Sequence, residues 1–90
     1  MKKYSIQYTD KAEEHIKNLK KKHKHLIPKL GDLLKEIEQH PRTGTGKPEY
    51  LKHKKYWSRR INKEHRLCYE IYDDVVVVLV LSAYGHYDNE

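Results

Sequence analysis

The chain has 90 residues, with 19 Lys or Arg against 13 Asp or Glu, so its net charge is +6 and its isoelectric point is near 9.4. We expect a single domain over residues 1–90, with one modest hydrophobic core. The N-terminus lacks the apolar stretch of a secretory signal or membrane span, and a single cysteine, Cys68, excludes an internal disulfide. We therefore expect a cytoplasmic protein that does not associate with membranes. Its positive charge favours a nucleic acid or an acidic protein as partner, although small soluble proteins without such partners are also often basic.

The first half of the chain predicts one strand followed by two helices. Residues 4–8 alternate apolar and polar side chains, as in a strand with one buried face. Asp10 is the expected N-cap of a helix that continues into a lysine-rich segment, residues 20–24. A second helix has Pro28 in its first turn and ends at Pro41, because proline disfavours the helical conformation of the residue before it.

The second half predicts an irregular segment and then three strands. Residues 42–55 are polar and hold two glycines and a proline, so we expect a long loop, which in a small domain is usually functional or disordered. Residues 56–61, 65–72 and 75–81 resemble strands joined by short turns, and the last is apolar throughout, as in a strand buried on both faces. The expected fold is α+β, in the order β-α-α-β-β-β, with two helices packed on a mainly antiparallel sheet.

Positive charge is concentrated in residues 42–66. This segment has nine Lys or Arg residues against two Glu residues, a net +7 in a chain whose total is +6. Glu49 lies among these bases, and a second polar cluster, residues 84–87, follows the last predicted strand. If the sheet brings the two segments together, a carboxylate, an imidazole, a phenol and several guanidinium groups share one basic surface.

Such a set of groups suits the cleavage of an RNA phosphodiester by its own 2′-hydroxyl. The reaction needs a base for the 2′-hydroxyl proton, an acid for the 5′-oxygen leaving group and positive charge for the phosphorane-like state. A carboxylate and a histidine can serve as base and acid, and an arginine fork matches the phosphate oxygens. We therefore expect neither a metal nor a cofactor, and the scattered histidines show no metal-ligand spacing.

Each candidate residue also has a purely structural alternative. Glu49 fits a surface ion pair, His86 a solvated histidine and Arg66 a cross-strand partner of a carboxylate. Trp57 fits either the core or a platform for stacked bases, and Cys68 fits a small buried side chain better than a nucleophile. From the residues alone, a nuclease and a nucleic-acid-binding protein without chemistry both remain open.

Four sequence blocks follow one another along the chain. They are Gly44-Thr45-Gly46-Lys47-Pro48-Glu49-Tyr50-Leu51-Lys52, Tyr56-Trp57-Ser58-Arg59-Arg60-Ile61, Glu64-His65-Arg66-Leu67-Cys68-Tyr69 and His86-Tyr87. In this order they resemble the YoeB/Txe toxins of the RelE superfamily, which belong to bacterial type II toxin–antitoxin modules. The resemblance covers almost the whole chain. It implies a RelE-like fold and ribosome-dependent cleavage of mRNA in the A site, which inhibits translation.

The resemblance also implies roles for individual residues. Glu49 matches the general base, Arg66 the phosphate-stabilising arginine and His86 the general acid. Tyr87 matches a tyrosine that positions the substrate. The basic residues expected to hold RNA are Lys47, Lys52, Arg59 and Arg60.

The implied partners are the ribosome with its mRNA and a YefM/Phd-type antitoxin whose acidic segment covers the site. Operator DNA would be contacted only through the antitoxin, and homodimers occur in the family. An alternative in the same superfamily acts by binding alone, either on gyrase, as the ParE branch does, or only on an antitoxin. The chain departs from the family pattern in its loop between Lys52 and Trp57, which is shorter, and at its end, where residues 88–90 follow the His-Tyr pair.

Overall fold

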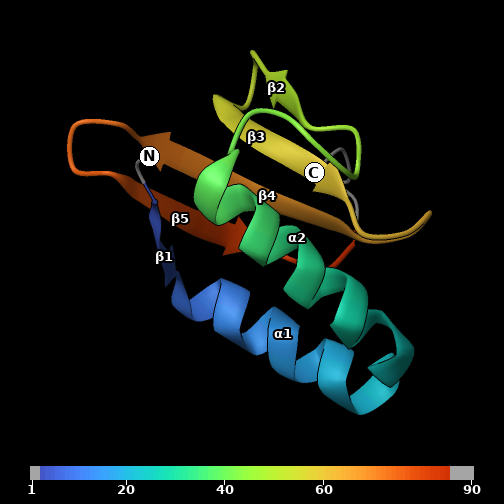
Figure 1. The fold of residues 1–90 in the computed structure, drawn as a ribbon. Coiled ribbons are helices and arrows are strands. Elements are labelled where there is room, and N and C mark those ends of the chain that lie inside the picture. The colour runs from blue at the N-terminus through green and yellow to red at the C-terminus, as the bar shows by residue number, and fades with distance from the viewer. Residues whose placement is uncertain (1–2, 86–90) are drawn as a thin grey trace.

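The structure, a computed structural model, describes residues 3–85. The elements follow in the order β1 (Ser5–Tyr8), α1 (Asp10–Lys22), the 3₁₀ turn η1 (Lys24–Leu26), α2 (Ile27–Gln39), β2 (Glu49–Leu51), β3 (Tyr56–Arg60), β4 (Arg66–Tyr72) and β5 (Val77–Ser82). Figure 1 shows the two helices side by side on one face of the five-stranded sheet. The predicted α+β class, with two helices packed on a mainly antiparallel sheet, is confirmed.

The sheet has the strand order β1-β5-β4-β3-β2. Neighbouring strands from β2 to β5 are antiparallel, so the predicted meander of the last three strands is confirmed. Strand β1 instead runs parallel to β5, with Ser5 opposite Val77 and Tyr8 opposite Val80. The N-terminal strand therefore forms one edge of the sheet and β2 forms the other.

Strand β2 lies inside residues 42–55, which the sequence predicts to be a loop. Its three residues are too few to show the alternation of a strand, and they follow directly after Pro48. Pairing with β3, in which Glu49 lies opposite Ser58, defines the strand. Glu49 therefore stands on the edge of a sheet and not in a free loop.

The core lies between the helices and the sheet. It contains Ala12, Leu19, Leu26, Leu30, Leu33, Ile37, Ile61, Leu67, Tyr69, Val78, Val80 and Ala83. In β5, Val78 and Val80 are fully buried whereas Val77 and Leu79 are half-buried, so the prediction of a strand buried on both faces is wrong. The reason is that the helices cover only one face of the sheet (Figure 1).

Helix α1 is capped by Thr9 and not, as predicted, by Asp10. Thr9 has an extended backbone, and its Oγ1 accepts a hydrogen bond from the Ala12 N–H at 3.0 Å. Asp10 becomes the first helical residue, where a carboxylate interacts favourably with the helix dipole. The Thr9 hydroxyl also donates to the Leu81 carbonyl at 3.0 Å, so the cap ties α1 to β5.

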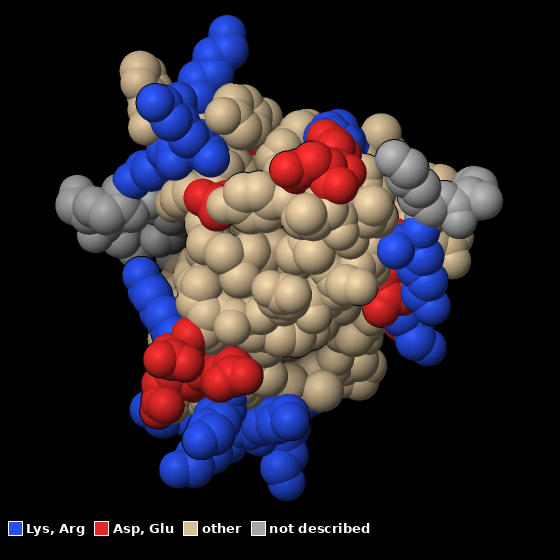
Figure 2. All heavy atoms as spheres, turned by 90° about the vertical axis from the view of Figure 1, so that its left-hand side faces the viewer, with Lys and Arg blue, Asp and Glu red and all other residues tan. Residues whose placement is uncertain are grey.

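Figure 2 shows the side of the molecule on which β1 and the β4–β5 turn lie. Acidic and basic side chains alternate around its rim, and its centre has neither. Neither helix in residues 3–85 has the length and apolar character that crossing a membrane requires.

Candidate active site

Glu49 and Arg66 face each other on the surface of the sheet opposite the helices. Arg66 Nη1 lies 3.9 Å from Glu49 Oε1 and donates a hydrogen bond to Ser58 Oγ at 3.4 Å. Three neighbouring strands, β2, β3 and β4, supply these side chains. The Glu49 side chain is 53% exposed and that of Arg66 only 13%, so a carboxylate open to solvent lies beside a guanidinium held by the sheet. The fold thus brings together two of the four residues expected to act in catalysis.

Small polar side chains stand beside Arg66 on the same face. Ser58 pairs with Cys68 across β3 and β4, and Cys68 pairs with Ser82 of β5. Burial raises the pKa of the Cys68 thiol, while hydrogen bonds with Ser82 and Ser58 and the charge of Arg66 act in the opposite direction. Cys68 is 2% exposed, so the prediction of a small buried side chain is confirmed.

The chain returns to this site at Gly85. The Arg66 main-chain N–H donates to the Gly85 carbonyl at 3.1 Å. His86 and Tyr87, the expected general acid and substrate-positioning residue, come next in the sequence and lie outside the described residues. The fold therefore places the segment that leads to them against Arg66.

Two of the predicted RNA-binding residues, Arg60 and Lys47, lie where β3 ends, and a third, Lys52, lies near the start of β3. Arg60 lies opposite Arg66 across β3 and β4, as expected for two arginines that flank one hairpin turn. The Arg60 N–H donates to the Gly46 carbonyl at 2.6 Å, so the exposed residue Lys47 follows directly after this contact. Lys52 is exposed on the turn after β2, three residues beyond Glu49. Three of the four predicted RNA-binding residues are thus on the surface.

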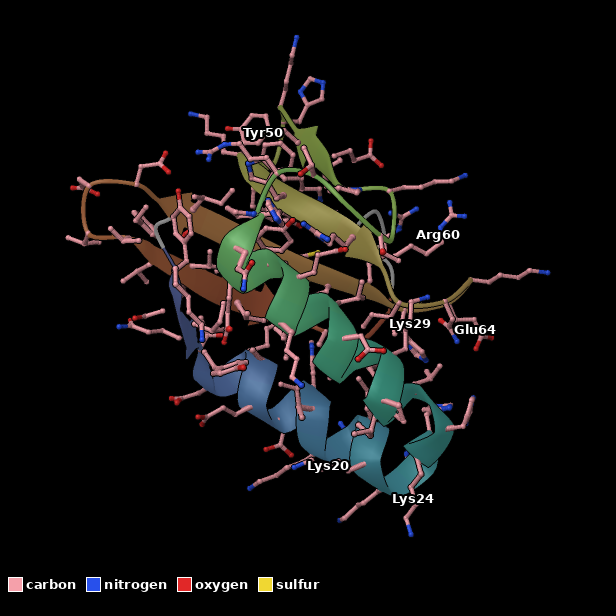
Figure 3. The ribbon with its side chains drawn as sticks, in the orientation of Figure 1. Lys20, Lys24, Lys29, Tyr50, Arg60 and Glu64 are labelled. Atoms are coloured by element: carbon pink, nitrogen blue, oxygen red, sulfur yellow. The ribbon has the colours of Figure 1, made fainter. Side chains whose placement is uncertain are left out.

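A hollow where β3 ends, called the basic edge below, includes a basic residue that no motif identified. Its lining residues are Lys29, Gly46, Lys47, Arg60, Ile61, Asn62 and Lys63. Lys29 belongs to α2, and its Nζ donates to the Ile61 carbonyl at 3.4 Å. Figure 3 shows Lys29 and Arg60 on the same side of the molecule, whereas Lys20 and Lys24 lie at the bottom of the view, farther from Arg60. Only the packing of α2 on the sheet brings Lys29 here, so sequence patterns had no signal for it.

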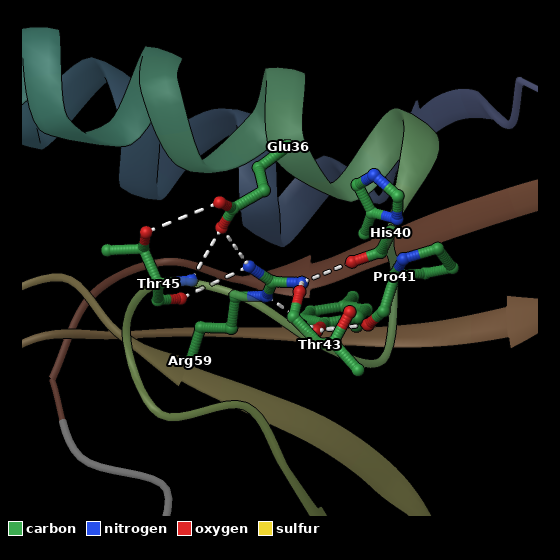
Figure 4. Close-up of polar contacts among 7 residues, drawn as sticks. Glu36, His40, Pro41, Thr43, Thr45 and Arg59 are labelled. Carbon is green, nitrogen blue, oxygen red and sulfur yellow. Dashed lines mark hydrogen bonds and ion pairs between the residues drawn. The ribbon is translucent and has the colours of Figure 1, made fainter.

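Arg59 has no access to this surface. Successive side chains of a strand point to opposite faces, so Arg59 points toward α2 while Ser58 and Arg60 point away from it. Its guanidinium is completely buried and forms an ion pair with Glu36 at 2.6 Å (Figure 4). The structure therefore corrects the expectation that Arg59 holds RNA.

The buried guanidinium instead holds the loop after α2. It donates to the carbonyls of His40 at 2.5 Å, Thr43 at 2.7 Å and Thr45 at 3.1 Å. Its Nε donates to the Tyr69 hydroxyl at 2.9 Å, which in turn donates to the Pro41 carbonyl at 2.7 Å. These bonds fix the course of the chain just before Gly46, Lys47 and Glu49.

Two other residues of the charge-rich segment are also structural. Arg42 pairs with Asp73 at 2.6 Å, and the Tyr4 hydroxyl donates to the same carboxylate at 2.6 Å. Trp57 packs against the core, with its ring 5.7 Å from that of Tyr50, which favours the core alternative over a base-stacking platform.

Within residues 3–85, no three His, Cys, Asp or Glu side chains are placed to hold a metal ion.

Comparison with known proteins identifies the family. Residues 8–87 match the model described as the YoeB-like toxin of bacterial type II toxin–antitoxin systems. The chain belongs to this family. A YoeB toxin from Escherichia coli K12 is 44% identical over 66 residues, which cover 71% of this chain and 76% of the relative. A YoeB toxin from Streptomyces coelicolor is 34% identical over 84 residues, which cover 91% and 98%.

Solved structures of YoeB toxins have the same fold. A YoeB/ParE toxin from Agrobacterium tumefaciens matches with a TM-score of 0.86 at 29% identity, covering 92% of this chain and 99% of the other. A YoeB dimer from Staphylococcus aureus matches with a TM-score of 0.82 at 36% identity, covering 94% and 99%. This YoeB-family chain is therefore a toxin of the RelE superfamily.

Proposed function

We propose that this YoeB-family toxin is an endoribonuclease that cuts mRNA in the ribosomal A site by attack of the RNA 2′-hydroxyl. The observation that carries the proposal is the contact between Glu49 and Arg66, 3.9 Å apart on the face of the sheet opposite the helices. The Gly85 carbonyl accepts a hydrogen bond from the Arg66 N–H, so the residue that precedes His86 in the sequence lies beside Arg66. Membership of the YoeB family supports the same reaction.

In the proposed reaction, Glu49 takes the proton of the 2′-hydroxyl. The 2′-oxygen then bonds to phosphorus, the bond from phosphorus to the 5′-oxygen breaks, and His86 gives a proton to the leaving oxygen. The products are a 2′,3′-cyclic phosphate and a 5′-hydroxyl. Arg66 stabilises the additional negative charge on the phosphate oxygens, and the sheet holds its guanidinium in place before the reaction begins. Tyr87 positions the substrate.

In this proposal, RNA is bound by the basic edge and by Lys52. Lys47, Lys52 and Arg60 contact the phosphate backbone, and we add Lys29 to them because it is exposed and lines the same hollow as Lys47 and Arg60. Because these are exposed charges, we expect their contribution to depend strongly on salt concentration. The A-site mRNA and the surrounding ribosome supply the phosphates.

Two further kinds of partner follow from relatives of known structure. A YoeB–YefM toxin–antitoxin complex from Staphylococcus aureus, in which YoeB is 37% identical to this chain, was solved as a heterotetramer, and a YoeB from the same organism as a dimer. We extend both to this chain: a YefM/Phd-type antitoxin covers the site, and two copies of the toxin can associate. Operator DNA is contacted through the antitoxin, and the protein acts in the cytoplasm.

The test uses the purified chain, ribosomes that carry a defined mRNA, and primer extension to map cuts. Glu49→Gln keeps the shape of the side chain but removes the base, so we expect a loss of roughly 10²- to 10⁴-fold in cleavage rate. Glu64→Gln removes the same charge from an exposed position on the β3–β4 turn and should cut normally. Arg66→Lys and His86→Gln should each cut far more slowly than the unmodified chain.

Undiminished cleavage in all three site variants would overturn the proposed mechanism. Absence of cleavage by the well-folded, unmodified chain would favour action by binding alone. Inhibition of gyrase would then be the next activity to measure, because a binding protein needs neither Glu49 nor His86 as a proton carrier.

A further inference from the structure

Two histidines hold residues 83–85, which lead directly to His86 and Tyr87. His15 Nδ1, from α1, accepts a hydrogen bond from the Ala83 main-chain N–H at 3.2 Å. His65 Nδ1, in the turn directly before β4, accepts one from the Gly85 N–H at 2.9 Å. A main-chain N–H can only donate, so both Nδ1 atoms must be without a proton. The tautomer of each neutral ring is thereby fixed, with its proton on Nε2.

The side chain between these two bonds is also held. The ring of Tyr84 lies 4.4 Å from that of His65, 5.9 Å from that of His15 and 6.0 Å from that of His23, measured between ring centroids. Ala83 is completely buried and His65 is 5% exposed. Residues 83–85 are therefore fixed by main-chain hydrogen bonds and by ring packing together.

Both main-chain polar groups of Gly85 form hydrogen bonds. The Gly85 N–H donates to His65 Nδ1, and the Gly85 carbonyl accepts from the main-chain N–H of Arg66, the residue after His65. His65 is itself fixed in the hairpin turn, since its N–H donates to Asn62 Oδ1 at 2.7 Å and its carbonyl accepts from the Ile61 N–H at 2.9 Å. The ring that holds Gly85 thus belongs to the residue directly before Arg66, whose guanidinium faces Glu49.

We propose that neutral His15 and His65 are positioning residues: they hold residues 83–85 beside Arg66, and this hold supports the catalytic roles proposed for His86 and Tyr87, the next two residues in the sequence. This inference rests on the proposed ribonuclease function. Neither histidine is assigned a proton transfer, because each Nδ1 is occupied by a main-chain N–H. Their contribution is to fix Gly85, from which the chain continues to the proposed general acid, and a misplacement of about 1 Å in a catalytic site can cost roughly 100-fold in rate.

The arrangement is sensitive to acid. A proton on either Nδ1 would replace an acceptor by a donor facing an N–H, which would break the bond and release residues 83–85. The titratable groups around the rings are Lys11 and Glu14 beside His15, Tyr84 between the rings, and His23, whose ring centroid is 5.0 Å from that of His65. Burial and Lys11 lower the pKa of His15, against the opposing charge of Glu14, so its neutral form persists below the usual range.

The first test measures hydrogen exchange of the Gly85 amide by NMR in the full chain. His65→Phe keeps a ring against Tyr84 but removes the acceptor, and we expect this amide to exchange about ten times faster. His65→Asn places an amide oxygen near the former Nδ1 position and should restore protection. His25→Phe is the matched control, because His25 is exposed and its ring lies against His23. Unchanged Gly85 exchange in His65→Phe would overturn the proposal.

The second test measures cleavage of ribosome-bound mRNA by the same variants. His65→Phe should lower kcat roughly 10- to 100-fold with KM for the ribosome changed less than about two-fold, and His65→Asn should recover most of the loss. Faster Gly85 exchange with normal kcat would also overturn the positioning role. If the unmodified chain does not cut RNA, the proposed function fails, while the exchange measurement still decides whether His65 holds the segment.

Discussion

Arg59 and Glu36 form an ion pair in which the guanidinium is completely buried and the carboxylate keeps 31% of its side-chain surface exposed. Their closest atoms, Nη1 and Oε1, are 2.6 Å apart, and the same guanidinium binds three main-chain carbonyls of the loop after α2. One side chain thereby connects β3, α2 and the loop that leads to Glu49. Arg59 is therefore part of the structure that supports the site, although its sequence block is rich in surface bases.

Replacing Arg59 by Met should destabilise the protein. The variant leaves Glu36 without its ion-pair partner and three main-chain carbonyls without their donor, and because each buried group left unpaired costs about 1–3 kcal/mol, we expect a total loss of about 3 kcal/mol or more. The free energy of unfolding in urea measures the effect. Arg60→Met is the matched control, since Arg60 is exposed, and it should change stability by less than about 0.5 kcal/mol. Equal stability of the two variants would contradict this role of Arg59.

Glu36 should make stability depend on pH in the acid range. The Thr45 main-chain N–H, and after it Arg59, lowers the pKa of the Glu36 carboxyl, and burial opposes this shift. The folded state therefore favours the ionised form, so the stabilisation is complete above the unfolded pKa of about 4.3 and is lost as pH falls through the lower, folded pKa.

Urea midpoints measured from about pH 6 to pH 3 test this dependence. Glu36→Gln should be less stable than the unmodified chain at pH 6, and the difference should shrink toward pH 3. Glu64→Gln, on an exposed turn, should follow the unmodified chain across the range. If the unmodified and Glu36→Gln curves ran parallel, Glu36 would not be the responsible group.

Two glycine-to-alanine substitutions should have opposite effects. Gly46 has φ +87°, and an added Cβ would lie 2.9 Å from the Arg60 carbonyl oxygen, so Gly46→Ala should cost about 1–2 kcal/mol and disturb the segment before Glu49. Gly31 lies in α2, and apart from its own helix backbone no atom lies within 4 Å of an added Cβ, so Gly31→Ala should stabilise by about 0.5–1 kcal/mol. Thermal unfolding of both variants, with cleavage assays, measures the contrast, and two changes of the same sign would refute it.

Lys29 should contribute to RNA binding through the hollow it shares with Lys47, Arg60 and Lys63. Lys29→Ala should weaken binding to programmed ribosomes and reduce the slope of log affinity against log salt by about one. Lys20→Ala removes the same charge from α1, away from this hollow (Figure 3), and should leave the slope unchanged. Identical salt slopes for both variants would show that the hollow does not bind phosphate.

Local patterns predicted the elements whose signals lie within a few residues. Period-two alternation marked β1 and β4, and the prolines at 28 and 41 marked the limits of α2. Strand β2 was not predicted because three residues are too few to show an alternation of apolar and polar side chains. The burial of β5 was overestimated because an apolar sequence shows only which side chains are present. Their exposure depends on which face of the sheet the helices cover.

The sequence by itself determined the order of all the strands and α-helices except β2, and the charge-rich segment that contains both Glu49 and Arg66. Tertiary structure alone decided that Arg59 and Arg60, adjacent and equal in charge, have opposite environments. It also brought Lys29 to the basic edge, and His15 and His65 to residues 83–85. The physical reason is that burial and hydrogen-bond partners depend on segments far apart in the chain. For Arg59 these are Glu36 and the loop after α2, which meet the strand only when the helices pack on the sheet.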